Sequence, residues 1–183
     1  MYFSILENLY DLEQDGQWEA IRKLLYKQWE NHKSKLESLV TLAFECWIVL
    51  SEWHCCIKNE NLNYDLFKDN LIDVYNYGIE HFDNNQIFQC LFGYMMSLFP
   101  NLFYSDDDLS GEKYVLYENK GKAMLEKSYR NNPNNLLAKV LFFGTTDKTK
   151  EYNKAREEIK PLLTTLFPGK TAIEQYFKEV LSF

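Results

Sequence analysis

The sequence predicts an all-α fold, and three observations support this. Apolar residues recur at helical spacing along nearly the whole chain. The 183 residues include only 7 Gly and 4 Pro, too few for the dense turns of a β-sandwich. Helix-capping residues stand ahead of several apolar segments. We therefore expect about eight to nine antiparallel helices in a single domain that covers residues 1–183.

The N-terminal part of the chain predicts three helices. The first runs from about Ser4 to Gln14 and ends at an Asp-Gly pair. The second carries large apolar side chains at helical spacing over residues 18–29. The third is long, from residue 34 to about residue 58, and Ser34 with Glu37 predicts a capping box at its start.

The middle of the chain predicts two further helices and one irregular stretch. A fourth helix covers residues 65–82, and an Asn-rich turn leads into a fifth over residues 86–99. Pro100 ends this helix because proline lacks the backbone donor and collides with the preceding turn. Residues 101–111 form the one long irregular segment.

The C-terminal part predicts shorter helices. A sixth helix spans residues 112–129, and Asn132-Pro133 is expected to start a seventh. Asp147 can cap an eighth helix, which Pro161 interrupts. Thr171 and Glu174 form a second capping box before a last helix that runs to about residue 181.

A helix, an Asn-rich turn and a second helix occur twice, with Asn85 and Asn135 at equivalent positions. The stretch from Lys122 to Phe143 carries Ala123, Leu125-Glu126-Lys127, the turn 132–135 and Ala138, and it resembles a tetratricopeptide repeat. This resemblance covers about one and a half repeats and lacks the family's Trp and Leu-Gly. It implies irregular tetratricopeptide-like hairpins and a protein that binds a peptide or protein partner.

Acidic residues gather on one face of the predicted fourth helix. At about 100° per residue, five carboxylates fall within an arc of about 80°. Like charges four residues apart destabilise a helix, and Lys68 is the only adjacent base. This face is therefore a candidate docking surface for a basic protein; a solvated face that maintains solubility is the alternative. Its residues are Asp65, Asp69, Asp73, Glu80 and Asp83.

The uneven charge excludes some function classes. The chain has a net charge of −7, and residues 61–111 hold eight acids and a single base. A nucleic-acid binder shows a basic stripe instead. We expect no membrane partner, because no stretch of 18 apolar residues occurs and no basic leader precedes the first helix.

No constellation of residues indicates catalysis, a metal or a cofactor. Gly169-Lys170-Thr171 lacks the upstream glycine of a phosphate-binding loop. His54, Cys55 and Cys56 lack the paired spacing of zinc ligands. We expect the four cysteines, at positions 46, 55, 56 and 90, to be reduced, buried thiols of a cytosolic protein, and His54 to be half-buried. We therefore expect a protein that is not an enzyme.

The acidic, Tyr/Phe/Asn-rich composition and the stretch Phe167 to Phe177 resemble bacterial immunity proteins of contact-dependent growth inhibition and other polymorphic toxin systems. The resemblance implies a cytoplasmic antitoxin whose partner is a cognate basic toxin domain, such as a nuclease. Beside the five carboxylates, the expected contacts are a second acidic patch and two aromatic anchors: Asp106, Asp107, Asp108, Tyr104 and Tyr114. A tetratricopeptide-like adaptor is the alternative function.

Overall fold

The computed structural model describes residues 8–53, 62–105 and 110–182, and every regular element within them is helical. The prediction of an all-α fold is thus confirmed. None of the helices in these three ranges has the length and apolar character needed to cross a membrane.

The first half of the chain folds into five α-helices and a short 3₁₀-helix. In chain order they are α1 (Leu9–Gln14), α2 (Trp18–Asn31), α3 (Leu36–Ser51), α4 (Tyr64–Phe82), α5 (Gln86–Leu98) and η1 (Pro100–Phe103). Pro100 does end α5 as expected, and the chain continues directly as η1.

The second half begins with α6, the longest described helix, and ends with α10, which contacts α1. The elements are α6 (Glu112–Asn131), α7 (Leu136–Gly144), α8 (Thr149–Ile159), η2 (Lys160–Leu162), α9 (Leu163–Leu166) and α10 (Ala172–Ser182). Pro161 lies in η2, so the predicted interruption of the eighth helix is confirmed.

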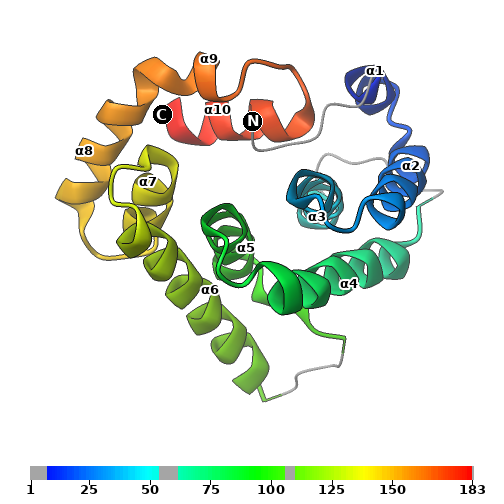
Figure 1. Ribbon diagram of the computed structural model, residues 1–183, viewed down its shortest axis with the longest axis horizontal. Helices are drawn as coiled ribbons and strands as arrows, with labels where there is room; N and C mark the ends of the chain where they lie inside the picture. Colours follow the sequence, from blue (N-terminus) through cyan, green and yellow to red (C-terminus); the bar gives the residue numbers. More distant parts are fainter. Residues whose placement is uncertain (1–7, 54–61, 106–109, 183) are drawn as a thin grey trace.

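The helices alternate between the inside and the outside of the molecule (Figure 1). Helices α3, α5 and α7 lie towards the centre, and α2, α4, α6 and α8 lie around the outside. The burial pattern agrees, because α3 is apolar and buried along nearly its whole length whereas α4 and α6 bury one stripe each. The outer helices therefore present the polar faces of the protein.

Asparagine side chains cap the N-termini of three helices. Asn85 accepts hydrogen bonds from Ile87 N and Phe88 N at the start of α5, and Asn135 accepts one from Ala138 N at the start of α7. The two asparagines of the internal similarity thus have the same structural role. Asn63 caps α4 in the same way.

Three sequence-based helix starts are wrong in detail. Helix α3 has Lys35 as its N-terminal flanking residue and no side-chain cap, so Ser34 forms no capping box. Helix α7 begins only after Asn135, because its side chain, rather than the Asn-Pro pair, satisfies the first free amides. Asp147 does not cap α8, which follows Lys148. The predicted extension of the third helix to residue 58 falls outside the described residues.

The two cysteines that the structure describes, Cys46 and Cys90, are free and buried, as expected. Burial raises the pKa of the Cys90 thiol to about 12, so this thiol stays protonated at neutral pH. The other predicted members of this group, His54, Cys55 and Cys56, lie outside the described residues.

Candidate functional site: an acidic face on α4

One face of α4 is buried and the opposite face carries the predicted carboxylates. The buried stripe consists of Phe67, Asn70, Leu71, Val74, Tyr75 and Gly78. About half a turn away, four carboxylates are exposed to solvent. We call these four residues, Asp65, Asp69, Asp73 and Glu80, the acidic ridge.

A buried arginine fixes the rotation of α4 about its axis. Arg22 of α2 donates a hydrogen bond of 2.7 Å to Asn70 Oδ1, and its guanidinium group lies over the Phe67 ring. Glu19 accepts a second hydrogen bond of 2.7 Å from Arg22 and neutralises it. Since Asn70 and Phe67 must face α2 and the core, the acidic ridge must face solvent.

Within the described residues, ion pairs do not neutralise the acidic ridge. No lysine or arginine of the described ranges forms a salt bridge with any of its four carboxylates. Partial burial raises the pKa of Asp73, and the neighbouring charge of Asp69 raises it further, whereas Lys33 lowers it. The repulsion between carboxylates four residues apart that the sequence predicts is therefore present in the fold.

Tyr26 of α2 lies near acids of both α2 and α4, which the sequence did not indicate. Burial raises the pKa of the Tyr26 phenol, and the charges of Glu30 and Asp73 raise it further, which places Tyr26 close to acids of two helices. Glu30 is exposed. No pattern within α2 points to this arrangement, because it depends on which face of α2 packs beside α4.

Lysines of α4 and α6 lie over two tyrosine rings next to α4. Lys68 lies 5.8 Å from the centre of the Tyr104 ring, and Lys113 of α6 lies 6.0 Å from the same ring. Lys120 of α6 lies 5.1 Å from the Tyr75 ring. The base that acts on a carboxylate of the acidic ridge is Lys33, which lowers the pKa of Asp73, so the expectation that Lys68 is the only adjacent base is wrong.

Asp83 differs from the four residues of the acidic ridge. Its carboxylate accepts a hydrogen bond of 2.8 Å from Lys127 Nζ of α6 and one of 2.9 Å from Gln89 Nε2. The hydrogen bond from Lys127 lowers the pKa of Asp83 below its usual range. Asp83 thus ties the turn between α4 and α5 to α6, and its charge is already matched within the chain.

The remaining predicted contacts are only partly described. Tyr104 is half-buried, and its ring packs 5.2 Å from that of Tyr117. Tyr114 is exposed and is followed by two exposed aliphatic residues, Val115 and Leu116. The second acidic patch, Asp106 to Asp108, lies outside the described residues.

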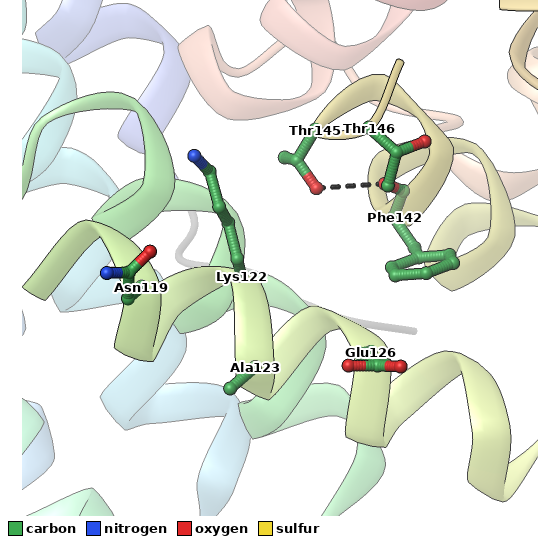
Figure 2. A pocket seen from close by; sticks show the side chains of 7 residues that line it. All are labelled: Asn119, Lys122, Ala123, Glu126, Phe142, Thr145 and Thr146. Atoms are coloured by element: carbon green, nitrogen blue, oxygen red, sulfur yellow. Dashed lines mark hydrogen bonds between the residues drawn. The ribbon is translucent and has the colours of Figure 1, made fainter. Parts of the chain in front are cut away.

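A shallow pocket of about 360 Å³ lies elsewhere, between α6 and the end of α7 (Figure 2). Two of its polar side chains have partners: Lys122 pairs with Glu118, and the Thr145 hydroxyl donates to the Phe142 carbonyl oxygen. The residues that line the pocket are Asn119, Lys122, Ala123, Glu126, Phe142, Thr145 and Thr146.

Within the described ranges, no group of three His, Cys, Asp or Glu side chains is arranged to hold a metal ion. The acidic ridge is thus an exposed surface of negative charge, suited to contact with a cationic surface. Comparison with known proteins finds no family model, no curated protein and no solved structure that matches this chain.

Proposed function

We propose that this protein binds a basic protein through the acidic ridge, and that it acts as an immunity protein that neutralises a cognate toxin domain. The observation that supports the proposal is the row of exposed carboxylates on α4 that have no ion-pair partner in the described chain. Such a row raises the free energy of the unbound protein, and a cationic partner relieves it.

The chemistry of the face favours electrostatic capture. Complementary charge speeds the encounter of two proteins and rejects wrong partners, more than it adds to affinity. A nuclease domain suits this face, because its substrate cleft must carry positive charge for phosphates. A ridge of carboxylates occupying that cleft would exclude the substrate.

The proposal is tested by co-expression with the C-terminal domain of a large secreted toxin, if the gene immediately upstream encodes one. Host cells should survive with the wild-type chain. The double charge reversal Asp69→Lys and Asp73→Lys should slow association at low salt by about tenfold or more and weaken protection.

A matched control places the same change on another outer helix. Glu151 and Glu157 of α8 are exposed, and their reversal to lysine alters the net charge equally. Association should stay near the wild-type rate in this control. Equal association rates for both double variants at low salt would show that the acidic ridge is not the docking face.

An adaptor that binds a peptide is the second candidate. The alternation of inner and outer helices favours it, since helical-repeat proteins bind partners on such layered surfaces (Figure 1). In that case the chain would bind its partner without protecting cells from any toxin domain.

A further inference from the structure

A carboxyl group is buried in the core of the protein where a charge is costly. Glu45 lies in the middle of α3, between apolar neighbours, and only 1% of its surface is exposed. Neither of its side-chain oxygens accepts a hydrogen bond from a described N–H or O–H donor. A carboxylate in this position would destabilise the fold, because removing a lone charge from water is costly.

A second buried carboxyl group lies within hydrogen-bonding reach of the first. Glu13 of α1 is 7% exposed, and its side chain contacts that of Glu45. Its Oε2 atom accepts a hydrogen bond of 2.7 Å from Ala172 N, the first residue of α10. Its Oε1 atom accepts none from a described donor. The pair therefore joins α1, α3 and α10.

Two carboxyl groups in contact need a cation between them, and the structure favours a proton. A further carboxylate that acts on Glu13 is that of Glu174, whose oxygens already accept hydrogen bonds from Gly169 N and the Thr171 hydroxyl. The described residues offer no third ligand for a metal ion here. A proton on Glu45 can be donated to Glu13 and satisfies both groups.

The other charged groups around the junction act elsewhere. Arg22 of α2 acts on the Cys46 thiol, next to Glu45 in the chain. Lys178 of α10 donates to the Gly169 carbonyl oxygen, and Lys170 lies over the Tyr10 ring. From the described parts of α4 and α5, no charged group contributes to the electrostatics of the pair. Among the described residues, no cationic side chain acts on the pair in place of the proton.

We propose that a proton shared by Glu45 and Glu13 acts as a latch that holds α10 against α1 and α3, and that its loss at raised pH releases α10. The latch closes the chain upon itself, because Glu13 and Ala172 belong to its first and last helices (Figure 1). This inference concerns the fold and does not depend on the proposed function.

The direction of the pH dependence follows from the burial. Desolvation raises the pKa of Glu45 well above its ordinary value, and the charge of Glu13 raises it further. Desolvation also raises the pKa of Glu13, although the Ala172 amide opposes this. A group with a raised pKa in the folded state contributes its full stability at acidic pH. That stability decreases as the pH rises towards and through the folded-state pKa.

The test compares the wild-type chain with Glu45→Gln across the pH range. The glutamine is neutral at every pH and can donate an N–H to Glu13. In the wild-type chain, the folding equilibrium constant should fall by up to about tenfold per pH unit above the unfolded-state pKa of a glutamate. In Glu45→Gln this one-proton slope should be missing.

Glu37→Gln is the matched control, because Glu37 is an exposed glutamate of the same helix. It should keep the wild-type slope. Hydrogen exchange, corrected for the intrinsic rate, should show that the amides of α10 lose protection before those of α3 as the pH rises. Identical pH slopes for Glu45→Gln and the wild-type chain would overturn the latch.

A second measurement decides the question if Glu45→Gln does not fold. The infrared spectrum of the folded wild-type chain at neutral pH should contain the band of a protonated carboxyl group in a hydrogen bond. In Glu13→Gln, which removes the neighbouring charge, the pH at which this band disappears should be lower. A wild-type spectrum without the band at neutral pH would rule out the shared proton.

Discussion

Gly93 of α5 and Gly121 of α6 face each other where the two helices cross. A Cβ atom on either residue would lie 2.8 Å from the carbonyl oxygen of the other. Backbone atoms form this contact, so no side chain can move aside to make space. The two glycines thus allow the inner helix α5 to pack directly against the outer helix α6.

The first prediction concerns this crossing. Gly121→Ala should destabilise the protein by about 1–3 kcal/mol, because the added methyl group overpacks a rigid backbone contact. Urea unfolding measures the change. Asn119→Ala, at an exposed position of the same helix, should change the free energy of unfolding by less than about 0.5 kcal/mol. If Gly121→Ala were as stable as the wild-type chain, the close approach of the helices would be wrong.

The second prediction concerns the cost of the acidic ridge. Asp73→Asn should raise the free energy of unfolding at neutral pH by about 0.2–0.5 kcal/mol, because it removes the repulsion from Asp69. The gain should shrink as the pH falls through the raised pKa of Asp73, where the wild-type side chain also becomes neutral. Thermal unfolding at several pH values checks this. A destabilised Asp73→Asn would mean that a partner for Asp73 exists within the chain.

The third prediction concerns the ion pair of Asp83 and Lys127. A double-mutant cycle with Asp83→Asn and Lys127→Met should give a coupling energy of about 0.2–1 kcal/mol, as for other partly exposed pairs. Because the pKa of Asp83 is lowered, this stability is present above the ordinary aspartate pKa and is lost as the pH falls through the folded-state value. A coupling energy of zero at low salt would return Asp83 to the candidate docking residues.

The fourth prediction concerns the two equivalent capping residues. Asn85→Ala and Asn135→Ala should each cost about 1 kcal/mol, because each leaves backbone amides at a helix start without an acceptor. Asn84→Ala and Asn134→Ala change the exposed neighbouring asparagines and should be close to neutral. Denaturant unfolding of the four variants distinguishes the two pairs. If Asn84→Ala cost as much as Asn85→Ala, and Asn134→Ala as much as Asn135→Ala, the asparagine content of these turns rather than helix capping would stabilise them.

The sequence predicted the acidic ridge correctly as a surface because one helix contains all the necessary information. The buried stripe with Phe67 and Val74 and the exposed acids with Asp69 and Asp73 lie on opposite faces at helical spacing. The helical spacing of these residues therefore determines which side chains of α4 are buried and which are exposed. The same reasoning grouped Asp83 with these acids, since it could not show that Lys127, 44 residues later, would be its partner.

Glu45 shows the opposite limit. In the sequence it is the single charged residue within the apolar segment 39–50, and this position interrupts the apolar segment but indicates nothing more. Its importance comes from Glu13, which lies on another helix and is held in place by the amide of Ala172. Contacts between residues so distant in the chain have no periodic signature.

The sequence by itself determined the helical class, most helix limits and the side of α4 that carries negative charge. These are local properties, since backbone hydrogen bonding, capping and the helical period act over a few residues. Only the tertiary structure decided which charges are matched, which carboxyl groups are buried together and which helices border the acidic ridge. These depend on how the helices pack, because desolvation and Coulomb interactions act between residues that folding brings together.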